Sequence, residues 1–253
     1  MSINKKKLNI FEEDKIRSIL IKTNKIKELR GSYIKRKVRN LNTSNFWDKH
    51  INKSSDFKKQ DKMTKDRIRS AVKFTNIESG KLLDIGLGCG FFEKIIKKEK
   101  PKINLYGIDI SKSAIKKIKQ NSIGVFKIGS VLEIPFKQNF FDVVIALEVL
   151  EHIPATEIFS VYKEIKRVLK KKGKLILSIP VYENCSIKKN PSRHMRAYTP
   201  EIIITELTLA GFKINKIKTF CAFAKYYYLK KVIRLFLPKK WKQNIVLIRT
   251  QLK

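Results

Sequence analysis

Three glycines at alternate positions, Gly86, Gly88 and Gly90, follow directly on the apolar run of residues 81–85. The residues after them, FFEKIIKK, have the apolar spacing of a helix, so the glycines form a turn between a strand and a helix. Glycine at such a turn costs conformational entropy and is expected where a ligand closely approaches the main chain. Backbone N–H groups at the start of the helix can then bind that ligand. A turn of purely structural use is the alternative.

The spacing of these glycines differs from that of a dinucleotide-binding turn. The pattern G-x-G-x-x-G would place its last glycine at position 91, where this chain has Phe91. This difference disfavours a nicotinamide-dependent dehydrogenase and favours a nucleoside ligand without a long phosphate chain. Asp109 ends the next apolar run, where a carboxylate can accept hydrogen bonds from both hydroxyls of a ribose. The alternative role for Asp109, capping the following helix, is already served by Ser111.

The elements that must position these residues alternate along the chain. Short apolar runs separated by amphipathic segments indicate a parallel sheet covered by helices on both faces. A helix after Pro154 is expected to end near Gly173, and Thr199 and Pro200 begin another. The predicted strands are residues 81–86, 104–110, 124–129, 141–149, 174–180, 212–220 and 244–252.

Two basic segments flank this alternation. Residues 1–76, with helices expected near 11–29 and 57–76, form a basic helical extension or lid before a domain of residues 77–253. Within that domain, residues 224–241 mix aromatic and aliphatic residues with six basic residues, and they predict a helical insertion before the last strand. This insertion either packs on the sheet beneath lysine side chains or contacts an anionic membrane surface.

Four segments occur in the order and spacing typical of class I S-adenosylmethionine-dependent methyltransferases: LLDIGLGCGFF, LYGIDIS, GSVLEIPFKQNFFDVVIALEVLEHI and VLKKKGKLILSIP. Over about residues 77–215 the chain resembles the broad type 11 group, which includes the ubiquinone-biosynthesis O-methyltransferases. The resemblance implies an α/β, Rossmann-like, doubly wound fold. Its seven-stranded sheet would be mostly parallel with an antiparallel last strand, between a helical N-terminal extension and the helical insertion.

The resemblance also implies the cofactor, S-adenosyl-L-methionine, and the residues that bind it. Asp84 and Gly86 would hold the methionine amino end of the cofactor. Gly88 and Gly90 would allow its close approach to the main chain. Asp109 would bind the ribose.

The adenine and methionine regions have further counterparts in the sequence. Ser130 stands where the family often has an acid that binds the adenine amino group, so a charge-assisted hydrogen bond is lost. The backbone of Val131 would then contribute more to adenine binding. Leu147 and Glu148, after the fourth strand, would line the methionine and sulfonium region.

Methyl transfer from a sulfonium requires little acid–base chemistry, because the protein needs mainly to align the acceptor and exclude water. A general base helps where the acceptor is a hydroxyl. His152 and His194 are the candidate bases, with His50 in the N-terminal segment as the third histidine. For each, the alternative is an exposed or structurally bonded imidazole. Residues 146–149, Ala-Leu-Glu-Val, lack the Asn/Asp-Pro-Pro-aromatic stretch of amino-base methyltransferases, which disfavours nucleic-acid base methylation.

Composition limits the remaining choices. The 253 residues carry a formal net charge of +35, which attracts phosphates or an anionic membrane, although a lysine-rich genome bias is the alternative. Three distant cysteines predict neither a disulfide framework nor a zinc site, no metal site is predicted, and a reduced, cytoplasmic compartment is favoured. The N-terminus lacks the apolar region of a signal peptide, and no apolar run is long enough to span a bilayer.

The sequence therefore predicts a cytoplasmic methyltransferase, with peripheral membrane contact as one option. It would transfer the methyl group of S-adenosyl-L-methionine to a small-molecule or lipid-linked acceptor by direct in-line displacement. One alternative is an RNA or macromolecule methyltransferase recruited by its basic surface. Another is a catalytically inactive binding protein with the same fold.

Overall fold

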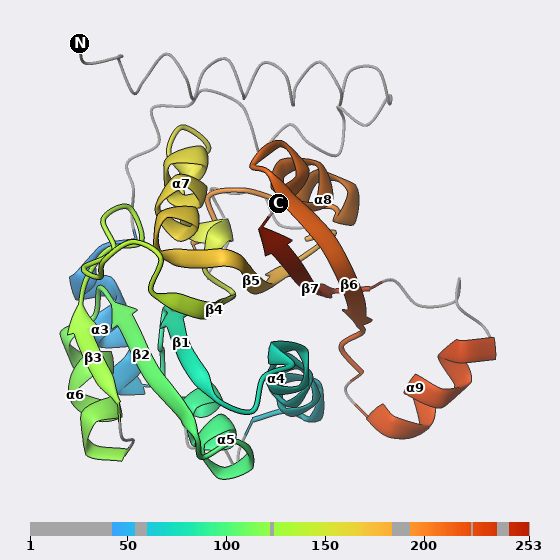
Figure 1. Cartoon of the computed structure of the whole chain (residues 1–253). Helices are drawn as coiled ribbons and strands as arrows, with labels where there is room; N and C mark the ends of the chain where they lie inside the picture. Colours follow the sequence, from blue (N-terminus) through green and yellow to red (C-terminus); the bar gives the residue numbers. More distant parts are fainter. Residues whose placement is uncertain are drawn as a thin grey trace.

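A seven-stranded sheet forms the centre of the computed structural model, which describes residues 42–53, 60–121, 124–183, 193–223, 225–236 and 243–252 (Figure 1). The strand order is β3-β2-β1-β4-β5-β7-β6. Strands β1 to β5 pair in parallel, and β7 is antiparallel to both of its neighbours. The strands are β1 Gly80–Ile85, β2 Ile103–Asp109, β3 Val125–Ile128, β4 Phe141–Leu147, β5 Leu169–Pro180, β6 Phe212–Phe220 and β7 Ile245–Leu252.

Helices cover both faces of the sheet, as the alternating pattern predicts (Figure 1). Leu82 packs into the core beneath α4, α5 and α6, whereas its neighbour Leu83 packs into the core beneath α7 and α8. Successive side chains of a strand point to opposite faces, so one apolar run supplies both cores. The helices are α3 Ser44–Lys53, α4 Lys62–Thr75, α5 Phe91–Glu99, α6 Lys112–Asn121, α7 Ile158–Val168, α8 Pro200–Leu209 and α9 Tyr227–Phe236, with a short 3-10 helix η2 at Leu150–His152.

The strand order places later strands on both sides of β1. The chain runs outward from β1 to β2 and β3, and then returns to the other side of β1 as β4. Parallel strands that diverge in this way leave a crevice at their carboxyl ends, where open α/β sheets bind their ligands. The glycine turn, Asp109 and Glu148 all follow or end strands at this edge.

The doubly wound α/β fold with an antiparallel last strand is confirmed, but one helix end was predicted wrongly. Helix α7 ends at Val168, and Gly173 lies inside β5 rather than at the helix terminus. The physical reason is that Leu169 already pairs with Phe141 of β4, so sheet pairing begins directly after the helix.

The two basic segments are described in part. The helix expected at 11–29 lies outside the described residues, while the one expected at 57–76 is found as α4. The insertion contains α9, which contacts α4 and β6 through its polar side, and Tyr227 is its buried residue within the described part. Within the described residues, no helix combines the length and apolar character needed to cross a membrane.

Candidate active site

The three glycines of the turn have left-handed backbone conformations, with φ of 79° at Gly86, 54° at Gly88 and 72° at Gly90. The three glycines differ in what a side chain at their position would contact. A Cβ at Gly86 would lie 2.6 Å from Val149, and one at Gly90 would lie 2.5 Å from Ile118. A Cβ at Gly88 would meet nothing within 4 Å. Gly88 therefore faces open space, whereas Gly90 leaves room for the Ile118 side chain of α6.

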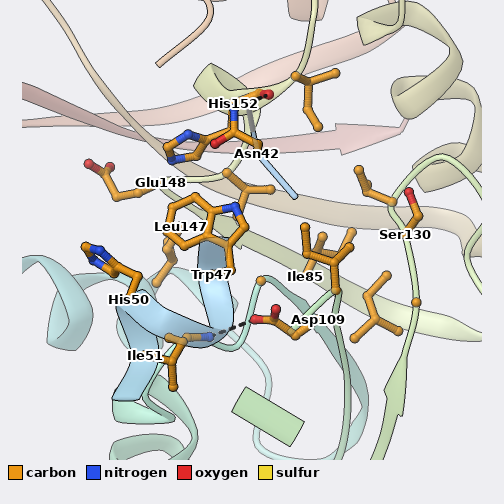
Figure 2. Close-up of a pocket in the computed structure, with 18 of the residues that line it drawn as sticks. Asn42, Trp47, His50, Ile51, Ile85, Asp109, Ser130, Leu147, Glu148 and His152 are labelled. Carbon is orange, nitrogen blue, oxygen red and sulfur yellow. Dashed lines mark hydrogen bonds between the residues drawn. The ribbon is translucent and has the colours of Figure 1, made fainter. Parts of the chain in front are cut away.

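That open space is a cavity of about 410 Å³ at the carboxyl edge of the sheet (Figure 2). The glycine turn, the ends of β2 and β4, the segment after β3 and helix α3 all contribute to its wall. The predicted residues that line it are Gly86, Gly88, Asp109, Ser130, Val131, Leu147, Glu148 and His152. Asp84, Gly90 and His194 are absent from the described lining.

Asp109 lies at the rim of this cavity, at the end of β2 (Figure 2). One carboxylate oxygen accepts a hydrogen bond from the N–H of Gly88 at 3.1 Å, and the other accepts one from the N–H of Ser111 at 2.8 Å. Burial raises the pKa of Asp109, although these backbone hydrogen bonds oppose the shift. Each carboxylate oxygen can accept a second hydrogen bond, so this side chain remains able to bind a ribose.

Asp84 lies beneath the turn rather than in the cavity wall. It is fully enclosed on β1, next to Glu93 of α5. Burial and the neighbouring Glu93 raise the pKa of Asp84 well above its ordinary value, and burial also raises the pKa of Glu93. Asp84 is thus absent from the described cavity lining, and its contact with the methionine amino group stays a prediction.

The segment after β3 forms one wall of the cavity. The Ser130 hydroxyl accepts a hydrogen bond from the N–H of Leu132 at 3.2 Å. Ile110, Val131 and Leu132 add apolar surface beside it. This wall offers an aromatic base a mainly apolar contact, with the Ser130 hydroxyl as the polar group.

Glu148 is held in place by residues that are distant in the sequence. Its carboxylate accepts a hydrogen bond from the Ser178 hydroxyl at 2.8 Å and lies 3.3 Å from the guanidinium of Arg67. Arg67 also donates to the Ser178 hydroxyl at 2.7 Å. Glu148 adopts a left-handed backbone conformation with φ of 58°, which is rare for a residue with a side chain and is typical of functional sites.

Helix α3 covers the cavity from the N-terminal side. Trp47, His50 and Ile51 line the cavity, and the Trp47 ring lies 4.8 Å from the His152 ring, edge to face. Asp48 fixes this helix, because its carboxylate accepts hydrogen bonds from the Ser111 hydroxyl at 2.7 Å and the Ser113 N–H at 2.9 Å. The start of α6 is thereby joined to the cover of the cavity.

The two candidate bases lie side by side, with ring centroids 4.8 Å apart. His152 lines the cavity, and burial, followed by the nearby His194, lowers its pKa to about 3. His194 lies behind it, with Nδ1 bonded to the Glu183 carboxylate at 2.7 Å. His152 is therefore neutral at physiological pH, and His194 does not reach the described lining of the cavity.

The charge of the cavity contrasts with that of the chain. The chain has 57 lysines and arginines against 22 acidic residues. Among the described residues that line the cavity there is no lysine or arginine, while Asp109, Glu148 and Glu157 contribute carboxylates. Such a lining favours a cationic ligand and disfavours a chain of phosphates.

Residues 83–177 match a family model described as a methyltransferase domain. Residues 83–177 thus form a methyltransferase domain of the type 11 group. The matched region begins within β1 and ends within β5, so it includes the glycine turn, Asp109 and Glu148.

Two curated relatives resemble the methyltransferase domain in sequence. An uncharacterized protein of Methanocaldococcus jannaschii is 32% identical over 142 residues, which cover 56% of this chain and 59% of the relative. The demethylmenaquinone methyltransferase of Thermotoga maritima is 27% identical over 118 residues, which cover 45% of this chain and 49% of that protein. The chain thus spans only about half to three fifths of these relatives.

A solved structure has the same fold. The N-methyltransferase NodS from Bradyrhizobium japonicum, in complex with S-adenosylhomocysteine, superimposes with a TM-score of 0.63. The match covers 83% of this chain and 98% of NodS, at 16% sequence identity. At this identity the similarity establishes the fold.

The methyltransferase domain has a cavity that fits S-adenosylmethionine, the cofactor of this family. Gly88 leaves room for a ligand against the main chain, and the Asp109 carboxylate lies beside it. The acidic lining suits a sulfonium cation, and the wall at Val131 suits an adenine ring. The cofactor contacts of the individual residues remain predictions.

Sequence reasoning missed Arg67 and Trp47 as residues of this site. Arg67 and Ser178 are 111 positions apart, so no local pattern connects them. The one sequence signal for Arg67 is the use of arginine in a chain that mostly uses lysine, since arginine is favoured for buried hydrogen-bonded pairs. Trp47 has no comparable signal.

Proposed function

We propose that this protein is a methyltransferase that transfers a methyl group directly from S-adenosylmethionine to a small-molecule or lipid-linked acceptor. The observation that carries the proposal is the acidic cavity at the glycine turn, whose described lining has no lysine or arginine in a chain of net charge +35. S-adenosylmethionine, when bound, supplies a methyl group on a sulfonium that is already an activated electrophile. The protein's task is then alignment and exclusion of water.

Different residues of the cavity would bind different parts of the cofactor. Asp109 would bind the ribose, and Gly88 would allow the ligand to lie against the turn. The wall at Ser130 and Val131 would hold the adenine. Glu148, fixed by Arg67, would face the positively charged methionine region and stabilise it electrostatically.

The end of the cavity beneath α3 favours a small or lipid-like acceptor. Trp47 and Ile153 give this end of the cavity aromatic and apolar surface, and α3 covers it. A covered, largely apolar pocket suits a molecule that can be enclosed. The methylation of RNA, the alternative, would require a nucleotide to enter beneath α3.

Binding of the cofactor tests the assignment of the pocket. We expect calorimetric titration of the full chain with S-adenosylmethionine to show binding, and Asp109→Ala to weaken it at least tenfold, because two hydrogen bonds to a buried ribose are lost. Glu99→Ala, at an exposed acid on α5, is the matched control and should bind like the wild type. The absence of binding to folded wild-type protein would refute the assignment.

The acceptor class is tested by labelling. Full-length protein and methyl-labelled S-adenosylmethionine are incubated in separate samples with cellular extracts of lipids, of small molecules and of RNA. Label in the lipid or small-molecule fraction supports the proposal. Label only in RNA supports the macromolecule alternative, and cofactor binding without labelling of any fraction supports an inactive binding protein.

We further propose that α9 contacts an anionic membrane surface, which suits a lipid-linked acceptor. The polar side of this helix faces the protein. Asp66 of α4 accepts hydrogen bonds from the Tyr227 hydroxyl at 2.9 Å and the Lys231 ammonium at 2.7 Å, and Arg234 bonds to the Thr219 hydroxyl. The opposite side is apolar and between 51% and 79% exposed, at Tyr228, Leu229, Val232, Leu235 and Phe236.

This arrangement leaves the apolar face of α9 exposed, beside β6 (Figure 1). Spacing of one and three to four residues places these five side chains on one face of the helix. A positively charged protein is attracted to anionic lipids, and an apolar helix face can then bury itself at the acyl boundary. The charge of the chain and the exposed face therefore favour the same partner.

Vesicle sedimentation tests this contact. We expect the wild type to bind phosphatidylcholine vesicles that contain phosphatidylserine, and to bind vesicles of phosphatidylcholine alone much more weakly. The double variant Leu235→Ser, Phe236→Ser should bind at least tenfold more weakly because its buried apolar area is reduced. Ile217→Ser, at an exposed apolar residue of β6, is the control. Equal binding by the wild type and the double variant would contradict the proposal.

A further inference from the structure

Behind the cofactor cavity, Glu151, His152 and His194 place one potential ligand atom each within 4.8 Å of the others. Glu151 has an exposed fraction of 0%, and neither of its carboxylate oxygens has a hydrogen-bond partner among the described residues. The Nδ1 atom of His152 likewise has none there. A buried carboxylate is normally paired, protonated or bound to a metal ion, so these groups require an explanation.

The surroundings of Glu151 are acidic. The carboxylates of Glu148 and Glu183 lie near enough to disfavour a further negative charge there. Arg67 opposes this effect, but its guanidinium is bonded to Ser178 and paired with Glu148. A divalent cation next to Glu151 would compensate this local negative charge.

Each histidine is oriented by a second hydrogen bond. His194 uses Nδ1 for the Glu183 carboxylate, which leaves its other ring nitrogen available. The His152 ring is hydrogen-bonded to the backbone of Arg193, and because Nδ1 is unpaired among the described residues, this bond uses the other nitrogen. Metal-binding histidines typically donate their second ring nitrogen to a carboxylate or a backbone carbonyl in this way.

The two chain segments that contribute these ligands are fixed to each other. The carbonyl of Glu151 accepts hydrogen bonds from the N–H groups of Met195 at 2.8 Å and Arg196 at 3.2 Å. The buried Arg196 side chain donates to the Leu150 carbonyl at 3.0 Å and pairs with Glu206 at 2.8 Å. Both segments are thus held rigidly, as a preorganised binding site requires.

We propose that Glu151, His152 and His194 bind one divalent transition-metal ion. Two imidazoles and a carboxylate suit Zn²⁺, Mn²⁺, Fe²⁺ or Co²⁺, whereas Mg²⁺ and Ca²⁺ prefer ligands that are all oxygen. Three protein ligands leave at least one coordination position open.

The site also has a consequence that rests on the proposed function. Because His152 lines the cofactor cavity near Trp47, an ion bound by its ring would lie next to the cavity wall at that end. A metal ion there would bind and orient an acceptor that carries an oxygen group. This favours a hydroxylated or carboxylated acceptor over one with only apolar groups near the transferred methyl.

Metal analysis of the full chain tests the site. The protein is stripped with a chelator, reloaded with Zn²⁺, Mn²⁺ or Co²⁺ in separate samples, and passed over a desalting column. We expect about one equivalent of metal per chain for at least one of these ions, with visible absorption bands for bound Co²⁺. Glu151→Gln and His194→Gln should each weaken binding at least tenfold. Glu99→Gln, at an exposed acid of α5 away from the cluster, should bind like the wild type.

Thermal unfolding keeps the test independent of folding defects. Glu151→Gln removes an unpaired buried carboxylate, so the metal-free variant should be at least as stable as the metal-free wild type. Added metal should raise the Tm of the wild type but not that of Glu151→Gln. Binding of less than about a tenth of an equivalent, or equal binding by the wild type and both cluster variants, would overturn the proposal.

A parallel titration with S-adenosylmethionine separates this inference from the proposed function. Metal binding that depends on the cluster, without cofactor binding, would support the metal site and refute the methyltransferase assignment. Cofactor binding to a protein that takes up no metal would support the methyltransferase assignment and refute the metal site.

Discussion

Gly88 is the glycine of the turn whose missing side chain leaves space for a ligand. Gly86 and Gly90 also have positive φ angles, but the space that a side chain would occupy there is filled by Val149 at Gly86 and by Ile118 at Gly90. The three positions therefore separate two reasons for glycine, left-handed backbone geometry and access to the cavity. The sequence spacing alone does not distinguish these reasons.

This difference yields a matched pair of variants. Gly88→Ala and Gly90→Ala should each lose roughly 1–3 kcal/mol of stability, because both place a side chain at a left-handed position. Gly90→Ala should lose more, because its Cβ would lie 2.5 Å from Ile118. Only Gly88→Ala should also weaken S-adenosylmethionine binding, by at least tenfold, since its methyl group enters the cavity. Calorimetric titration and thermal unfolding of both variants measure the two effects. Equal cofactor affinity of the two variants would show that the ligand does not lie against Gly88.

At the scale of elements, Asp48 joins α3 to α6 of the methyltransferase domain. The carboxylate of Asp48 bonds to the first residues of α6, next to the Asp109 end of β2. The hydrogen bond from Ser111, followed by that from Ser113, lowers the pKa of Asp48 below its ordinary value of 3.8. These bonds therefore stabilise the position of α3 above pH 3.8 and are lost as the pH falls through the lowered pKa.

Asp48→Ala should loosen α3 without unfolding the sheet. The loss of about 1 kcal/mol of hydrogen bonding corresponds to roughly fivefold faster local opening. Hydrogen exchange measured by mass spectrometry should show faster exchange in residues 44–53 and unchanged exchange in β1 and β4. Lys49→Ala, at an exposed residue of the same helix, should show neither change. Unchanged protection of α3 in Asp48→Ala would mean that other contacts hold the cover.

At the scale of the whole molecule, charge is distributed unevenly between surface and site. The chain has a net charge of +35, yet the described lining of the cavity bears carboxylates and no lysine or arginine. Positive charges at the surface repel one another and reduce the stability of the compact state. The same charges attract anionic surfaces, which is consistent with the proposed membrane contact of α9.

Added salt should therefore stabilise the protein. Because the Debye length falls from about 30 Å at 0.01 M salt to about 8 Å at 0.15 M, repulsion between surface lysines is screened. The Tm of the full chain should rise by several degrees over this range, and S-adenosylmethionine should bind with little change in affinity. Unfolding scans and titrations in sodium chloride measure both. A Tm that falls with salt would contradict this account of the charge.

Local pattern in the sequence determined the strands, the helices from α4 onward apart from the end of α7, the glycine turn, the caps at Ser111 and Thr199, and the place of Asp109 at a strand end. It did not predict α3. Each of these depends on residues a few positions apart, so short-range sterics and apolar periodicity suffice. The two histidines were also named from the sequence, but as separate candidate bases.

Only the tertiary structure decided which of these residues meet. It placed Arg67 against Glu148, α3 over the cavity, and Glu151 with both histidines, and it left the apolar face of α9 exposed. It also buried Asp84 against Glu93, away from the described cavity lining. These contacts join segments far apart in the chain. Their geometry depends on how whole elements pack, which no local pattern specifies.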